Sequence, residues 1–331
     1  MGFASNSAFL RFHLLYYGQT AVIVFFVLSG YVIAHVIATR ERTLQEYAAS
    51  RFGRLYSVVL PALILTAICD YLGAMRDPGL YTAGGDAVVL RYMATSVFLN
   101  QFWLWPQLEP TYAPTFWTLS VELSYYVAIA LFVFARGYVR LISLVLLSVL
   151  TGPTIVLLAP IWFLGYGTYH FSQHRRMRID VAIAIWLISA LSLLSCYLIE
   201  VHVSGTLAFL RIPHPTLGGL LADYAGGIFF AINLIAFNAF SDRAEPFLMH
   251  FAGIIRWLGS MTFALYLFHY PLMYFFSAYS VGERSSFAQT TWLMAGTFLV
   301  VATLGHLCEQ SKGAYKKWFL SMWGRVAAVT I

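Results

Sequence analysis

Long apolar runs separated by short polar loops dominate the chain from about residue 19 to residue 308. A transmembrane helix needs about 20 mainly apolar residues. The pattern predicts helices at residues 19–39, 55–75, 115–135, 141–158, 181–199, 217–240, 257–279 and 287–308. A shorter run, 159–172, leads into a basic loop and predicts a ninth crossing. Because a β-barrel would show short segments of alternating polarity, we expect an all-α, polytopic transmembrane helical bundle with about nine crossings.

One stretch, residues 87–105, interrupts this pattern. It carries Arg91, Asn100 and Gln101 and ends in FWLWP, so we expect it to lie at the membrane interface or to re-enter the membrane. Neither a low-complexity linker nor a repeat divides the chain. We therefore expect a single membrane domain over residues 1–331, with residues 1–17 as a short N-terminal segment.

Composition supports lipid as the solvent of this chain. Its residues are 60% hydrophobic and 10% charged, and the mean hydropathy is +0.74, whereas soluble domains have about 45–50% apolar and about 25% charged residues. The net charge of +6 is scattered among loops, so no nucleic-acid partner is expected. Cys69, Cys196 and Cys308 lack CxxC spacing, and we expect neither a disulfide framework nor a metal site.

The distribution of basic residues predicts the orientation. Fifteen of the 20 Lys and Arg residues fall in one set of loops and ends, which includes the C-terminal region, and the positive-inside rule places this set in the cytoplasm. The other five are Arg11, Arg76, Arg91, Arg211 and Arg284. Nine crossings then place Met1 outside, and one more helix upstream would return the N-terminus to the cytoplasm.

Polar side chains inside a membrane helix are costly, so each marks a candidate functional site. Glu122 lies about a third of the way into its run, and a carboxylate there needs a partner or a proton. His269 falls near the middle of its run, where it either takes part in chemistry or hydrogen-bonds another helix. Ser29 and Gly30 favour close helix packing, although Ser29 also suits the wall of a polar cavity.

Three other residues have simple structural interpretations. His35 lies one turn from a cytoplasmic helix end, where it reaches water. Trp117 suits the interfacial aromatic belt. Glu309 ends the last apolar run and meets a basic tail, which favours a salt bridge or a helix-end contact.

Arg51 and Arg54 are three residues apart and share one face of a helix. Two guanidinium groups at a membrane entry point either anchor lipid headgroups or clamp a diphosphate, because arginine forms bidentate contacts with phosphate. The two residues alone do not decide between these roles.

Taken together and in order, five motifs resemble acyltransferase family 3, the integral-membrane enzymes that O-acylate sugars of surface polysaccharides and other glycans. FFVLSGY is similar to the family's FFVLSGF, and SRFGRLYSVVLPA to its two-arginine stretch. PTFWTLSVELSYY resembles its WSLSVE motif, LGSMTFALYLFHYPLM its LGxxSYxLYLxHxP helix, and HLCEQ its last span ending in Glu. The similarity covers about residues 18–317.

The resemblance implies ten helices in a bacterial inner (plasma) membrane, a cytosolic acyl-CoA donor, with acetyl-CoA expected, and a glycan or polysaccharide acceptor. The family's Arg-x-x-Arg pair is associated with acyl-CoA, and Arg51 and Arg54 match it. Its Trp-x-Leu-Ser-x-Glu element maps onto Trp117, Ser120 and Glu122.

Two departures concern the front of the chain. In the family, the first helix carries a basic residue and, about ten residues later, a catalytic histidine. Here His13 is too close to Arg11 and to the first span to match, and Ile23 stands where the family commonly has Asp. We therefore expect the family's first helix to be absent from this sequence, through a misassigned start or a truncation, in agreement with the topology argument.

The leading hypothesis is an acyltransferase of groups other than amino-acyl groups, which transfers an acyl group from a thioester directly to a sugar hydroxyl without a metal. A base must take the hydroxyl proton, and donors must stabilise the oxyanion. The candidate catalytic residues are Glu122, Ser29, Ser120 and His269, with Tyr266 as a further donor.

The alternatives are a catalytically lapsed or truncated family member, or a non-enzymatic membrane protein such as a transporter. Inverted repeats would favour a transporter, and none is visible. The sequence leaves the acceptor sugar, the length of the acyl group and the oligomeric state open.

Overall fold

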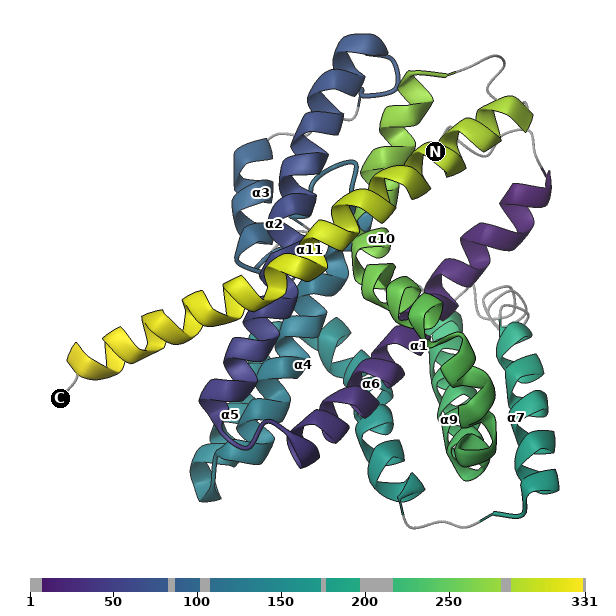
Figure 1. Ribbon diagram of the computed structural model, residues 1–331. Helices are drawn as coiled ribbons and strands as arrows, with labels where there is room; N and C mark the ends of the chain where they lie inside the picture. Colours follow the sequence, from purple (N-terminus) through teal and green to yellow (C-terminus); the bar gives the residue numbers. More distant parts are fainter. Residues whose placement is uncertain are drawn as a thin grey trace. The chain divides into compact units, whose positions relative to one another are not determined.

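The computed structural model describes residues 8–82, 87–101, 108–173, 177–196, 217–280 and 287–329. Within these ranges the chain is helical and contains no strand (Figure 1), which confirms the all-α prediction. The helices are α1 (Ala8–Thr39), α2 (Leu44–Arg76), α3 (Val88–Ser96), the 3-10 turn η1 (Pro114–Phe116), α4 (Trp117–Phe134), α5 (Gly137–Thr151), α6 (Pro153–Ser172), α7 (Ile179–Leu194), α9 (Leu217–His250), α10 (Ala252–Ala278) and α11 (Phe287–Val329).

Five of the described helices are long and apolar enough to cross a membrane, in agreement with an integral membrane protein. These segments are Gly18–Thr39, Leu44–Arg76, Pro114–Phe134, Gly219–His250 and Phe287–Gly324. α5 and α7 are shorter apolar helices. α3 has nine residues, about 14 Å at 1.5 Å per residue, which is too short to cross a bilayer. The number of crossings stays a prediction.

One helix break was predicted at the wrong place. The sequence suggested a boundary between residues 158 and 159, but α5 ends at Thr151 and α6 begins at Pro153. Gly152 has φ +86°, a backbone conformation that favours glycine after a helix. Pro153 suits the first helical turn because the missing N–H has no helical partner there. Pro160, by contrast, lies inside α6.

Helix α2 begins at Leu44, eleven residues before the predicted start at residue 55. Its first turn is fixed by a capping box: the Glu46 N–H donates to the Thr43 hydroxyl at 3.2 Å, and the Thr43 N–H donates to the Glu46 carboxylate at 3.3 Å. The first residues of α2 are polar, so a search for apolar runs did not include them in the predicted helix. As a result, Arg51 and Arg54 lie within a continuous helix.

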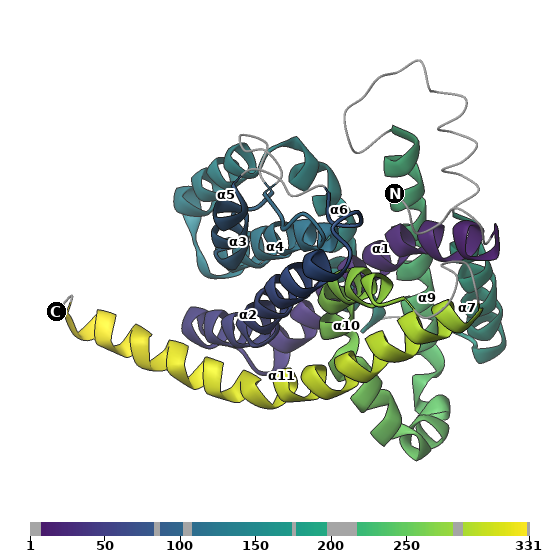
Figure 2. The same cartoon turned by 90° about the horizontal axis from the view of Figure 1, so that it is seen from above.

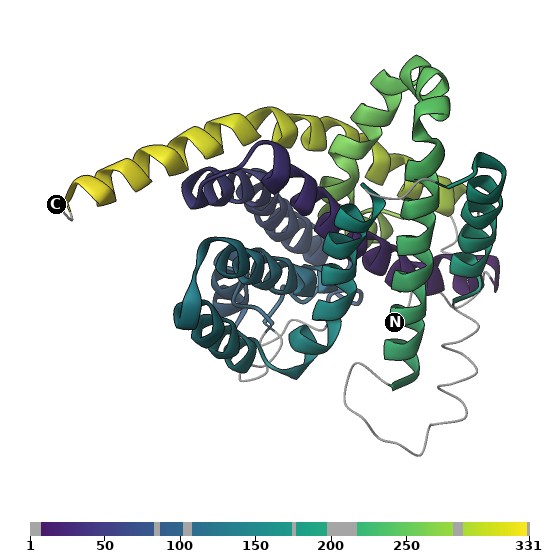
Figure 3. The same cartoon turned by 90° about the horizontal axis from the view of Figure 1, so that it is seen from below.

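The chain forms two compact units. A single membrane domain over residues 1–331 stays a prediction. Unit 1 comprises Met1–Arg42 and Pro153–Ala252, and unit 2 comprises Thr43–Gly152 and Gly253–Ile331. In unit 1, α9 packs between α6 and α7 (Figure 3). The Asn233 side-chain amide donates to the Trp186 carbonyl at 2.9 Å and fixes α9 against α7.

α1 and α6 cross closely in unit 1 because two glycines face the opposite backbone. A Cβ at Gly30 would clash with the Trp162 carbonyl, and one at Gly165 would clash with the Val27 carbonyl. Small residues allow membrane helices to approach in this way.

In unit 2, α2 packs against α3, α4 and α11, and α4 packs against α5. Figure 2 shows α11 running alongside α2. α10 is tied to the start of α4 by the Tyr266 hydroxyl, which donates to the Thr115 carbonyl at 3.1 Å. The Trp292 indole donates to the Phe276 carbonyl at 3.2 Å and joins α11 to α10.

Candidate active site

The two arginines of α2 differ in their surroundings. Arg51 is 8% exposed, and its guanidinium carbon lies 5.3 Å from the centre of the Tyr47 ring and 5.7 Å from that of Tyr126. Aromatic faces attract a cation at these distances. The Tyr47 hydroxyl donates to the Tyr126 carbonyl at 3.1 Å, which links α2 to α4 beside Arg51. Arg54 is less buried than Arg51.

Glu122 is 2% exposed in α4. The hydroxyl of Tyr126, one helical turn later, donates a hydrogen bond to the Glu122 carboxylate. Arg54 interacts electrostatically with Glu122, with Tyr126 and with Glu309 of α11. A buried carboxylate is tolerated when hydrogen bonds and opposite charge offset its loss of hydration, and the structure supplies both.

The contact between α2 and α11 places the backbone of two lysines beside Gly53. A Cβ at Gly53 would lie 2.9 Å from the Lys312 carbonyl oxygen and 3.2 Å from the Lys316 Cβ, so the two backbones meet directly. Phe52 packs against Phe319 with ring centres 4.7 Å apart. We call Arg51, Arg54, Lys312 and Lys316 the basic cluster.

Glu309 forms the salt bridge that its position suggested. Its carboxylate lies 3.3 Å from the Lys312 ammonium group, and both side chains are more than two-fifths exposed. Exposed pairs of this kind contribute about 0–1 kcal/mol. Glu309 therefore balances part of the positive charge of the basic cluster without neutralising it.

Ser120 is fully buried and holds a neighbouring segment in place. Its hydroxyl oxygen lies 2.8 Å from both the Phe98 carbonyl and the Asn100 side-chain oxygen and accepts from the Gln101 N–H at 3.1 Å. Phe98 has φ +61°, an unusual conformation for a side chain of this size. This network favours a structural role for Ser120, which secures a strained segment beside α4.

His269 and Tyr266 both lie in α10. The Nδ1 atom of His269 is 2.8 Å from the Tyr266 carbonyl and 3.1 Å from the Leu265 carbonyl, so this ring nitrogen bonds its own helix. Tyr266 lies beside Thr118 and interacts electrostatically with Glu122. Tyr266 of α10 thus interacts with the same carboxylate, Glu122 of α4, as Tyr126 and Arg54.

The remaining predicted residues are divided between the two units. Ser29 is 7% exposed and belongs, with Gly30, to unit 1. His35 is exposed, and its ring centre lies 5.6 Å from that of Tyr169. The side chain of His13 lies outside the described residues. Trp117 is the first residue of α4 and is partly buried.

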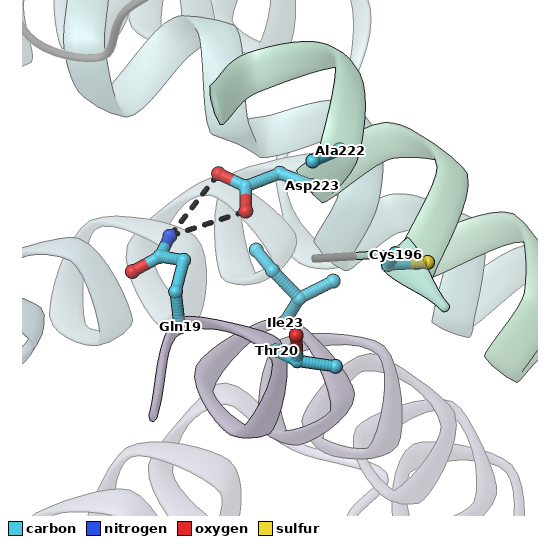
Figure 4. Close-up of a pocket in the computed structure, with 7 residues that line it drawn as sticks. Gln19, Thr20, Ile23, Cys196, Ala222 and Asp223 are labelled. Atoms are coloured by element: carbon cyan, nitrogen blue, oxygen red, sulfur yellow. Dashed lines mark hydrogen bonds between the residues drawn. The ribbon is translucent and has the colours of Figure 1, made fainter. Parts of the chain in front are cut away.

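A buried acid in unit 1 was missed by the sequence reasoning. Asp223 is 5% exposed, and the Gln19 amide lies 3.3 and 3.1 Å from its two oxygens (Figure 4). The void beside them measures about 10 Å³, room for about one water molecule. The signal was present, since an acid within a predicted span marks a candidate site.

Three residues of unit 2 were also missed: Tyr126, Lys312 and Lys316. Tyr126 follows Glu122 by four residues, and this spacing on a helix could have identified it as a partner. Lys312 and Lys316 carry no such signal, because only the packing at Gly53 relates them to α2. Among the described residues, no three His, Cys, Asp or Glu side chains gather in a metal-binding arrangement.

Comparison with known proteins gives one match. Residues 1–306 match the family described as "acyltransferase domain". No curated protein and no solved structure matches the chain.

Proposed function

From the premise that the chain belongs to this acyltransferase family, we propose that it transfers an acyl group from acyl-CoA to a hydroxyl of a glycan or polysaccharide. Acetyl-CoA is the expected donor. The family gives the general activity of a membrane acyltransferase. The basic cluster is the observation that supports the choice of donor.

Coenzyme A carries a diphosphate and a further phosphate on its ribose, so it requires several positive groups at one place. The basic cluster gathers two arginines and two lysines from helices that meet at Gly53. Arginine forms bidentate hydrogen bonds with phosphate oxygens, and lysine adds a compact positive charge. The aromatic rings around Arg51 hold one guanidinium in place, while Arg54 remains partly exposed.

The charge asymmetry of the loops supports the same donor. Arg51, Arg54, Lys312 and Lys316 all belong to the basic set that the positive-inside rule places in the cytoplasm. Acyl-CoA is available on that side of a bacterial inner membrane. The C-terminus is cytoplasmic in this proposal.

The reaction is a single acyl exchange. The acceptor hydroxyl oxygen forms a bond to the thioester carbonyl carbon, the carbon–sulfur bond breaks, and the hydroxyl proton ends on the released CoA thiol. A base must take this proton during attack, and His269 and Glu122 are the candidates in unit 2. Tyr266, which interacts electrostatically with Glu122, becomes the candidate donor to the oxyanion once its hydroxyl leaves the Thr115 carbonyl that accepts from it in this structure.

Acetyl-CoA binding to the purified protein tests the role of the basic cluster. Arg54→Ala is expected to weaken binding by about tenfold or more, because hydrogen bonds to charged groups contribute about 1.5–3 kcal/mol. Arg51→Ala is expected to act in the same direction. Calorimetry in lipid nanodiscs measures both variants.

Arg256→Ala is the matched control, since Arg256 is an exposed arginine of α10 in the same unit and in the same basic set. Wild-type binding by Arg54→Ala, or equal weakening by Arg256→Ala, would remove the cluster from the donor site. Acetyl-CoA binding without acetyl transfer to any glycan would instead indicate a lapsed enzyme.

A further inference from the structure

A second feature of unit 2 lies near the far end of α2. A cavity of about 550 Å³ is bordered by the last turns of α2, by α3 and by the segment before η1. Arg54 and Asp70 are 16 residues apart on this helix, about 24 Å at 1.5 Å per residue. This distance approaches the thickness of the hydrocarbon layer, about 30 Å. With α2 crossing the membrane along its length, the cavity and the basic cluster would lie toward opposite faces.

Tyrosine rings form much of the cavity. Tyr81 and Tyr112 line it, with ring centres 4.7 Å apart, and Tyr274 lies 5.1 Å from Tyr112. Gly73 makes this arrangement possible, because a Cβ there would clash with the Tyr81 ring. Tyr81 and Tyr112 are 8% and 7% exposed because they pack on each other, so a small part of each ring remains for a ligand. Aromatic side chains beside a few polar groups are typical of small-molecule sites.

One carboxylate oxygen in the cavity wall is left over. Oδ2 of Asp70 accepts a hydrogen bond from the Tyr92 hydroxyl at 3.2 Å. Oδ1 is buried, and no donor among the described residues reaches it. A buried acceptor without a partner is costly. Because Oδ1 is covered in this structure, a ligand hydroxyl satisfies it only after the carboxylate turns this oxygen toward the cavity.

The neighbouring charges favour a neutral ligand. Arg91 also lines the cavity, and its guanidinium donates to the Glu109 carbonyl at 3.0 Å. Asp70 and Arg91 carry opposite charges, and Glu109, which interacts electrostatically with Arg91, is not among the lining residues, so the lining itself carries little net charge. Hydroxyl groups, which both donate and accept, suit such a wall.

We propose that this cavity binds one sugar residue of the acceptor, with Asp70 accepting a hydrogen bond from a sugar hydroxyl and the tyrosines packing on the ring. The inference rests on the proposed function, because it assigns the acceptor side of the same reaction. It places recognition of the acceptor in unit 2, at the opposite end of α2 from the basic cluster.

Binding of methyl glycosides of glucose, galactose, mannose and N-acetylglucosamine tests the inference. The protein is held in lipid nanodiscs, and saturation-transfer NMR titrations give the affinities. Asp70→Asn is expected to weaken binding of the preferred glycoside about tenfold, since it removes a charged acceptor. Ala67→Phe is expected to abolish binding, because Ala67 lines the cavity from an exposed position and tolerates a larger side chain.

Asp180→Asn is the control for the loss of a carboxylate, since Asp180 pairs with Arg178 at the surface of unit 1. It is expected to bind as wild type does. Failure of every glycoside to bind the wild type, or unchanged binding in either Asp70→Asn or Ala67→Phe, overturns the inference.

Acetyl-CoA binding in the same samples separates the two proposals. Wild-type donor affinity in Asp70→Asn and Ala67→Phe shows that both variants are folded. If the wild type binds a glycoside but does not bind acetyl-CoA, only the donor assignment is contradicted. Donor binding retained, with sugar binding absent, contradicts the cavity assignment alone.

Discussion

At the scale of single residues, the pair Glu122–Tyr126 shows how a carboxylate is accommodated inside a membrane helix. The Tyr126 hydroxyl donates to Glu122, and its ring also faces the Arg51 guanidinium. One tyrosine thus contacts both charges of opposite sign. Replacing Tyr126 would therefore remove a hydrogen bond from Glu122 and an aromatic ring from beside the Arg51 guanidinium.

Tyr126→Phe keeps the ring and removes the hydroxyl. The buried Glu122 carboxylate then lacks this donor, and we expect a loss of about 1–3 kcal/mol of stability. The measurement is the unfolding free energy in detergent. Tyr138→Phe is the control, because Tyr138 is 85% exposed in α5. Equal stability of Tyr126→Phe and wild type would show that this hydrogen bond is unimportant.

At the scale of helices, two contacts between backbones decide how elements meet, one in each unit. In unit 1, α1 and α6 cross at Gly30 and Gly165, and in unit 2, α2 meets α11 at Gly53. A side chain at any of these positions would press on main-chain atoms, which cannot rotate away. The helix contacts therefore depend on the absence of a side chain.

Gly165→Ala tests this dependence, and Gly167→Ala on the same helix is its control. A Cβ at residue 165 clashes with the Val27 carbonyl, whereas at residue 167 it meets nothing within 4 Å. Overpacking costs about 1–3 kcal/mol, while alanine in an open helix position gains up to about 1 kcal/mol over glycine. Gly165→Ala should therefore have a lower midpoint of thermal unfolding in detergent than the wild type, and Gly167→Ala should not. Two equal midpoints would contradict the crossing.

Parts of these elements were predictable from sequence, and parts were not. Apolar runs identified the helices because burial in lipid demands long apolar segments. They misplaced the start of α2, since the segment from Leu44 to Arg54 is polar and is held by a cap. They also misplaced the break at Gly152, where backbone geometry decides and hydropathy does not change.

The candidate site was predictable to a similar extent. Glu122, Arg51 and Arg54 stood out as charges in or beside apolar runs. The approach of the Lys312 backbone to Gly53 depends on packing between residues more than 250 positions apart, which no local pattern encodes. The Asp70 cavity was missed because its walls come from three separate segments.

At the scale of the whole molecule, the asymmetry of the basic residues predicts a cytoplasmic C-terminus. Green fluorescent protein fused after Ile331 should therefore fluoresce in a bacterial host. Alkaline phosphatase fused at the same residue should be inactive, because it requires the oxidising periplasm. The reverse pair of results would invert the topology and place the basic cluster on the side without acyl-CoA.

Helix α2 has a consequence for selectivity. In the proposed scheme one end of α2 binds the CoA part of the donor and the other end binds a sugar ring of the acceptor. Arg54 and Asp70, which mark these two ends, are about 24 Å apart along the helix. In that scheme the basic cluster would hold the phosphates, which are the same in every CoA thioester, and so would not distinguish acetyl from longer chains. The choice of acyl group must then depend on the width of the path between the two ends. Variants in that middle stretch, rather than at the arginines, are where the length of the transferred chain would change.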